Sequence, residues 1–183
     1  MTDKQDTGRR SLTPIQERFV LHWGEMGTRW GINRTVAQVH ALLVLSPRPL
    51  NAEDIAATLG VARSNVSTSL RELQGWGIVR VTHILGDRRD HFESMKDVWE
   101  MFRVIVEERR QREAAPTLTM LREAAIDSKK PGAADAYTRE RLADLLQFFE
   151  LMTTWCEQTS KLPTSTLVRI VKMGDKIGRR LGA

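Results

Sequence analysis

The sequence predicts a mainly α-helical protein that carries one small β-hairpin, and three observations support this fold class. Residues 51–76 are predicted to form two short helices joined by a glycine turn. Residues 78–93 combine a β-branched run with turn residues, and apolar residues recur at helical spacings on both sides of this central region. We therefore expect an N-terminal arm and helix in residues 1–30, a central domain in residues 31–94 and a helical region in residues 95–183.

The first helix is predicted to begin at Thr13-Pro14, because threonine caps helices and proline is favoured at the first helical position. Gly27 is expected to end it. Between these points apolar residues recur at spacings of four, four and three, namely Ile15, Phe19, Trp23 and Met26. A stripe this apolar must pack on the body of the protein or on a second copy of the chain. We assign the helix to dimerisation.

The central stretch Asn51–Trp76 is predicted to form a helix-turn-helix, supported from behind by a helix that ends near Leu45 before two prolines. Asn51 is expected to cap the first helix of the motif, and Gly60 to supply the left-handed turn between the two helices. The second helix is predicted to start near Ala62, which cannot offer the capping side chain that serine, threonine or aspartate would.

The second helix of the motif is predicted to have one buried and one polar side. The buried side consists of Ala62, Val66, Leu70 and Leu73. The polar side is free of acidic residues up to Arg71 and consists of Arg63, Ser64, Asn65, Ser67, Thr68 and Arg71. Small hydroxyl and amide groups with guanidinium groups suit base edges and phosphates in a DNA major groove. The alternative is an ordinary solvated helix face.

The β-branched run Ile78–Ile84 is predicted to be a strand that returns through Asp90–Glu93 as a hairpin. The turn between them, Gly86-Asp87-Arg88-Arg89, would place Arg88 and Arg89 at the tip, facing phosphates or a minor groove. The alternative is a solvated turn in which Asp87 and Asp90 cancel the positive charge. A helix-turn-helix followed by such a hairpin is a winged helix, which we expect to bind double-stranded DNA.

The region after the hairpin is predicted to be a set of helices that form a dimer interface. Ser94 and Asp97 resemble a capping box that opens a long helix, and Pro116 is expected to kink or restart it. Asp135 is predicted to cap the next helix, and Pro163 to begin the last one. The last helix has an apolar seam with spacings of three and four, formed by Leu167, Ile170, Gly174, Ile177 and Leu181. These apolar faces exceed what one winged helix can cover, so a homodimer is expected.

Three phrases of the chain carry a family resemblance. They are LSPRPL at residues 45–50, RSNVSTSLRELQGWGIV at residues 63–79 and GDRRDHFESMKDVWEMF at residues 86–102. With them the chain resembles the GbsR-like group of winged-helix regulators, which are related to the MarR regulators. The resemblance covers the middle of the chain and implies a homodimeric transcriptional regulator, usually a repressor. Some relatives sense choline or similar quaternary ammonium compounds.

A small-molecule effector is predicted to bind near Trp99, on the helix that follows the hairpin. This helix would connect the wing to the dimer region, so a ligand against its first turns would alter the separation of the two DNA-reading helices. An aromatic lining suits a cationic or flat apolar compound. The alternative is that Trp99 belongs to the core.

Composition excludes several other classes of function. The net charge of +5 favours a polyanionic partner. A single cysteine, Cys156, offers no zinc cluster, and neither a phosphate-binding glycine loop nor a nucleophile motif is present, so we expect no metal, no cofactor and no enzyme activity. With no signal peptide and no long apolar run, a cytoplasmic protein without membrane contact is expected. A competing hypothesis is a winged helix that binds other proteins instead of DNA.

Overall fold

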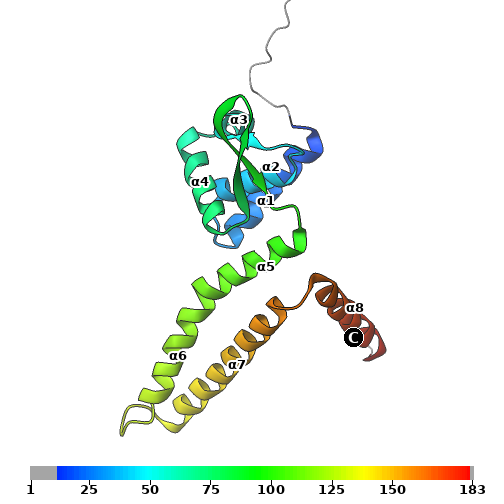
Figure 1. Ribbon diagram of the computed structural model, residues 1–183. Helices are drawn as coiled ribbons and strands as arrows, with labels where there is room; N and C mark the ends of the chain where they lie inside the picture. The colour runs from blue at the N-terminus through cyan, green and yellow to red at the C-terminus, as the bar shows by residue number, and fades with distance from the viewer. Residues whose placement is uncertain (1–11, 182–183) are drawn as a thin grey trace, which may run out of the picture. The chain divides into compact units, whose positions relative to one another are not determined.

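The computed structural model describes the backbone of residues 12–181 and the side chains of residues 12–174. The chain divides into two compact units, and the boundary between Met101 and Phe102 falls within one helix. The first unit contains four helices and a small sheet, and the second contains a helical hairpin followed by a further helix (Figure 1). This is the mainly α-helical fold with a small antiparallel sheet that the sequence predicts.

The helix-turn-helix lies where it was predicted. It consists of α3 (Ala52–Leu59) and α4 (Arg63–Gly75). The Asn51 side chain accepts a hydrogen bond from the Asp54 backbone N–H at 2.9 Å, which caps α3. Gly60 has φ 66°, a left-handed conformation that glycine adopts without a steric penalty, and it turns the chain between the two helices. Ala62 precedes α4 and makes no capping hydrogen bond, as its side chain dictates.

The core of the first unit lies between these helices and α2 (Arg34–Val44), with contributions from the sheet. Its members are largely aliphatic and almost free of solvent contact. The most deeply buried are Val39, Ile55, Val66, Leu70, Leu73 and Ile78. The predicted buried side of α4 is therefore confirmed for Val66, Leu70 and Leu73, whereas Ala62 is exposed because it lies before the first helical turn.

Helix α1 spans Pro14–Arg29 and packs closely on α2. The prediction that Gly27 ends this helix is wrong. Gly27 lies inside α1 and is buried, and an added Cβ would stand 2.5 Å from the Cβ of Ala37. Because a real Cβ does not approach that closely, the glycine serves helix contact. The buried face of α1 is Val20, Gly24 and Gly27, while Ile15 is exposed.

The sheet has three antiparallel strands in the order β1-β3-β2. The hairpin strands are β2 (Val79–Ile84) and β3 (Asp87–Ser94). The additional strand β1 (Leu50–Asn51), which the sequence analysis did not anticipate, pairs Leu50 with Phe92. Two residues carry no detectable strand pattern of their own, so this pairing depends on the tertiary position of the hairpin.

Helix α5 spans Val98–Arg109, and its cap differs from the prediction. Ser94 is the last residue of β3 and is buried, so it cannot cap the helix. Instead, the Asp97 carboxylate accepts hydrogen bonds from the backbone N–H groups of Trp99 at 2.9 Å and Glu100 at 3.1 Å. The acidic partner of the expected capping box thus performs the capping itself.

His40 on α2 is buried beside the end of the wing. Its Nε2 atom lies 3.4 Å from the Ser94 hydroxyl, a contact that links α2 to β3. Burial lowers the pKa of His40 to about 4, because a charged imidazolium would lose its hydration in the core.

Acidification is therefore expected to destabilise the first unit. Unfolded His40 takes up a proton below its ordinary pKa of 6.5, whereas folded His40 stays neutral down to about pH 4. The stabilising contribution is complete above pH 6.5 and is lost as the pH falls toward 4. We expect His40 to lower the free energy of unfolding by about 2 kcal/mol at pH 5 relative to pH 8. Urea unfolding at both pH values should show this difference in the wild type and a correspondingly smaller one in His40→Leu.

The second unit is built on a helical hairpin. The long helix continues from α5 through a π-helical turn, η1 (Arg110–Ala114), into α6 (Ala115–Asp127), and α7 (Ala136–Ser160) returns beside α6 (Figure 1). Pro116 was expected to kink or restart the helix. The π turn accommodates it, because the Ala115 N–H bonds to the Arg110 carbonyl five residues earlier and the turn is widened there. The Asp135 cap of α7 is confirmed, with the Thr138 N–H donating to its carboxylate at 2.6 Å.

Ion pairs and hydrogen bonds hold the second unit together. Arg122 on α6 pairs with Glu150 on α7 at 3.1 Å. Arg110 pairs with Glu107 at 2.7 Å and with Glu157 at 3.3 Å, and the Arg110 hydrogen bonds are the main cause that lowers the pKa of Glu107 to about 2.

Helix α8 spans Thr164–Leu181 and thus begins one residue after Pro163. The Arg103 guanidinium donates a hydrogen bond to the Leu162 carbonyl at 2.6 Å, just before α8. Of the predicted α8 seam, the Leu167 side chain is half-buried and Ile170 is exposed. The side chains of Ile177 and Leu181 lie outside the described residues.

Candidate DNA-binding surface

The outer side of α4 presents the small polar residues that the sequence placed there. Ser64, Asn65, Thr68 and Arg71 are exposed, while Ser67 is half-buried. Ser69 on the opposite side is buried, and its hydroxyl donates a hydrogen bond to the Asn65 carbonyl at 2.8 Å. The amphipathic period of the helix thus separates a packed side from a side that can approach another molecule.

Arg63 begins α4 and is held by a carboxylate of the preceding helix. Its guanidinium lies 2.8 Å from the Glu53 carboxylate of α3, and both side chains are largely exposed. Arg71, two turns further along α4, is exposed and makes a long 3.4 Å hydrogen bond to the Thr68 hydroxyl. The two guanidinium groups therefore differ, since one is ion-paired and the other is held only weakly.

The wing departs from the prediction at its tip. Arg88 and Arg89 were expected in the turn, but β3 already begins at Asp87, so both arginines lie in the first part of the strand. The turn itself contains Gly86 with φ 86° and the fully exposed Leu85. Turn residues alone do not specify where the hairpin ladder ends, and here the pairing of Ile84 with Asp87 shortens the turn.

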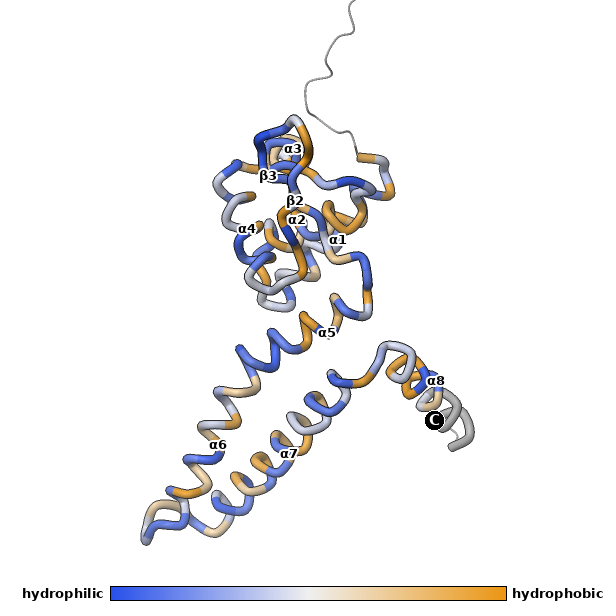
Figure 2. Tube along the Cα trace, viewed as in Figure 1, coloured by the Kyte–Doolittle hydropathy of each residue, from blue (hydrophilic) through white to orange (hydrophobic). Residues whose placement is uncertain are grey.

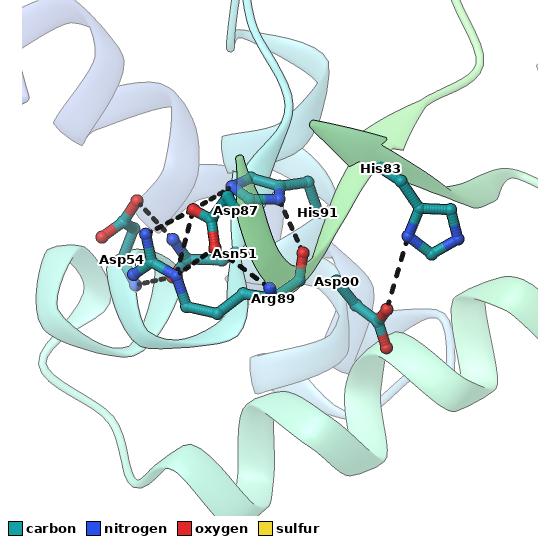
Figure 3. A network of polar contacts seen from close by, with 7 residues as sticks. All are labelled: Asn51, Asp54, His83, Asp87, Arg89, Asp90 and His91. Carbon is teal, nitrogen blue, oxygen red and sulfur yellow. Dashed lines mark hydrogen bonds and ion pairs between the residues drawn. The ribbon is translucent and has the colours of Figure 1, made fainter. Parts of the chain in front are cut away.

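Arg89 is fixed by an ion pair at the base of the wing (Figure 3). Its guanidinium binds both carboxylate oxygens of Asp87, with the shortest distance 2.6 Å. Asp87 also accepts the Arg89 backbone N–H at 3.0 Å. These hydrogen bonds hold the pKa of Asp87 well below its usual range and raise that of Arg89. Residues two apart on a strand share a face, which brings the pair together.

The buried His91 supports this pair from below. Its Nδ1 atom lies 3.0 Å from the Arg89 carbonyl, and its Nε2 atom lies 3.6 Å from the Asp87 carboxylate. Asn51 and Asp54 lie beside the cluster and bond to each other, and further out on the wing His83 faces Asp90 at 3.8 Å (Figure 3). The position of Arg89 is therefore set by contacts from the strand beneath it and not by the turn.

A half-open hollow of about 320 Å³ lies between α4 and the wing. It brings together four of the predicted site residues, Arg63, Ser67, Arg71 and Arg89. Its remaining lining residues are Ala52, Glu53, Leu70, Gln74, Val81, Asp90 and Phe92. Ser64, Asn65, Thr68 and Arg88 do not line it and present themselves on the outer surface instead.

Residues that hold the arginines were not assigned a role by the sequence analysis. Glu53 was expected only to stabilise the start of α3, and Asp87 only to cancel charge in the turn. The i, i+2 spacing of Asp87 and Arg89 would have indicated their pairing had residue 87 been placed in the strand. The contact between Glu53 and Arg63 crosses the helix-turn-helix and has no comparable signal in the sequence.

Trp99 lies in the first turn of α5, and 40% of its side chain is exposed. It is thus not a core residue within the described chain, in contrast to the alternative considered from the sequence. Its role as an effector contact remains a prediction.

Within residues 12–174, no group of three or more histidine, cysteine, aspartate or glutamate side chains is placed to hold a metal ion. None of the helices in the described part of the chain has both the length and the apolar character needed to cross a membrane.

The arrangement of α2, α3, α4 and the hairpin defines a winged helix-turn-helix. Residues 30–90 match the MarR family, a third of the chain that includes the whole helix-turn-helix and the wing turn. A solved structure described as a crystal structure of a transcriptional regulator is 21% identical, with a TM-score of 0.59, and the match covers 80% of this chain and 96% of that one. A comparison with curated proteins gave no match. The central domain is thus MarR-related, and the overall fold is shared with that regulator.

Proposed function

We propose that this chain is a sequence-specific DNA-binding transcriptional regulator that acts as a homodimer. The observation that carries the proposal is the outer side of α4, where hydroxyl, amide and guanidinium groups are exposed and no carboxylate occurs from Arg63 to Arg71. Such groups match the donors and acceptors of base edges in the major groove. The match of residues 30–90 to the MarR family supports the same function.

In the proposed complex α4 enters the major groove and the wing lies along the neighbouring backbone. Arg71, Ser64, Asn65 and Thr68 face base edges. Arg63 and Arg89 face phosphates, which replace the carboxylates of Glu53 and Asp87 as partners of the guanidinium groups. Ala62 leaves the first N–H groups of α4 without a side-chain cap, and backbone N–H groups at a helix N-terminus suit a phosphate.

We further propose that the protein is a repressor of the GbsR-like group, on the strength of the phrases at residues 45–50, 63–79 and 86–102. In a two-fold symmetric dimer the two α4 helices would meet half-sites about one DNA turn apart, roughly 34–36 Å. Control by a small effector that contacts Trp99 belongs to the same proposal.

The proposal is tested by a gel shift with DNA from upstream of the protein's own gene, compared with a shuffled fragment of equal length. We expect the upstream fragment to bind at least tenfold more tightly. Equal binding of both fragments would contradict sequence-specific reading. A complete absence of binding at low salt would favour the competing function, a winged helix that binds proteins.

Substitution of the arginines should separate base reading from phosphate contact. Arg71→Ala is expected to cost about 1–3 kcal/mol and to relax the preference at one position per half-site. Arg88→Ala with Arg89→Ala should weaken binding to all sequences alike and lower the salt dependence by about one unit per lost contact. Fluorescence anisotropy against salt measures both effects. Arg122→Ala removes the same charge from an exposed site in the second unit and serves as the control.

A further inference from the structure

The apolar residues of α7 lie on two different faces. One face is half-buried and packs on α6, and its members are Leu142, Leu146, Phe149, Thr153 and Cys156. The other face, here named the outer seam, remains exposed in the second unit. Its members, with their exposed fractions, are Leu145 (48%), Phe148 (57%), Leu151 (67%), Met152 (40%) and Trp155 (57%). Hydrophobic residues recur along the whole helix (Figure 2).

An exposed stripe of five large apolar side chains on one helix is typical of a surface that meets a partner. Four of its members, Leu145, Phe148, Met152 and Trp155, follow one another at spacings of three, four and three, the pattern of a helix that packs along another helix. The seam is therefore suited to a helical partner that runs along α7.

The charge of the seam indicates what kind of helix this partner is. Between Leu145 and Trp155 the chain has one charged residue, Glu150, and it pairs with Arg122 of α6 at 3.1 Å. At the N-terminal end of the seam, Arg141 and Asp144 pair with each other. A surface without net charge offers little attraction to nucleic acid or to a strongly charged protein. It is, however, free of repulsion toward an uncharged apolar stripe like itself.

We propose that the outer seam pairs with the outer seam of a second copy of the chain, in an antiparallel arrangement with Phe148 close to the two-fold axis. A parallel arrangement would place Arg141 and Asp144 level with the same residues of the partner, so that like charges face each other. In the antiparallel arrangement Arg141, seven residues before Phe148, lies level with the partner's Trp155, seven residues after it. A guanidinium group beside an indole ring is a favourable cation–π contact.

This inference rests on the homodimer of the proposed function and assigns its surface to α7. It differs from the sequence-based expectation, which placed dimerisation on α1 and on the seam of α8. It is testable without DNA, so a failure here would leave the DNA-binding proposal standing, and a failure of DNA binding would leave the pairing of α7 untouched.

Disulfide cross-linking in a Cys156→Ser background tests the arrangement. Phe148→Cys is expected to form a covalent dimer under mild oxidation, because the two positions meet at the axis. Arg141→Cys is expected not to, since the two copies of residue 141 would lie 14 residues apart along the helix axis, about 21 Å. Cross-linking of both variants would indicate parallel helices and would overturn the proposal.

Sedimentation of the full-length protein provides the second measurement. Phe148→Glu is expected to keep its helical circular dichroism and to weaken self-association at least tenfold. Ala143→Glu adds the same charge to an exposed position on another side of α7 and should leave self-association unchanged. A wild-type monomer at micromolar concentration would overturn the proposal, as would a Phe148→Glu protein that remains a dimer. So would a monomer in which the thiol of Phe148→Cys is protected from alkylation, since another part of the same chain would then cover the seam.

Discussion

Leu73→Ala is expected to lower the free energy of unfolding by about 2–5 kcal/mol. Leu73 is completely buried on the inner side of α4, so its truncation removes apolar contacts and leaves a cavity in a well-packed core. Domains of this kind are stable by about 5–15 kcal/mol, so the loss is a large share of the total. Urea unfolding followed by circular dichroism and tryptophan fluorescence measures it.

Thr68→Ala is the matched control for Leu73→Ala, because Thr68 lies on the same helix but on its exposed side. Its replacement should change the stability by less than about 0.5 kcal/mol while weakening specific DNA binding. A Leu73→Ala loss below 1 kcal/mol, or a large loss in Thr68→Ala, would contradict the orientation of α4. The two variants thus separate the packing role of this helix from its role at the surface.

Gly27→Leu is expected to cost about 3 kcal/mol or more, since it forces a side chain into the contact of α1 with α2. The first added atom would already stand 2.5 Å from the Cβ of Ala37, and the further atoms of leucine have no free space there. The substitution should separate α1 from α2 or unfold the first unit. Thermal and urea unfolding would report the loss.

Gly75 provides the comparison for Gly27. It lies at the end of α4, and an added Cβ would meet no atom within 4 Å. Gly75→Ala is therefore expected to stabilise the protein by about 0.5–1 kcal/mol, because alanine restricts the unfolded chain and favours the helix. If both glycines tolerated a side chain equally, the close packing of α1 on α2 would be refuted.

The ion pairs at Arg63 and Arg89 have a consequence for DNA binding. Each guanidinium group is already oriented by a carboxylate, Glu53 or Asp87, before DNA arrives. A phosphate must compete with that carboxylate, which reduces the net gain from each contact. Arg71 has no acidic competitor of this kind in its contact with Thr68. Base reading by Arg71 would therefore contribute more to the total affinity than its share of the charge suggests.

The sequence by itself determined the parts of the fold that depend on local chemistry. The Asn51 cap, the left-handed Gly60 turn and the buried stripe Val66, Leu70 and Leu73 follow from propensities and periodicities that act within a few residues. The exposed polar side of α4 follows from the same periodicity. These predictions were correct because no distant contact opposed them.

The tertiary structure alone decided features that depend on distant partners. Gly27 has the composition of a helix end, but Ala37 across the helix interface makes it an internal contact residue. Residue 87 has the composition of a turn, but the hairpin ladder includes it in β3 and sets it against Arg89. The ion pair of Arg63 with Glu53 and the division of the apolar α7 residues into a packed face and an outer seam likewise arise only when the elements meet. Local sequence cannot specify such contacts, because their free energy depends on residues that are brought together by the fold.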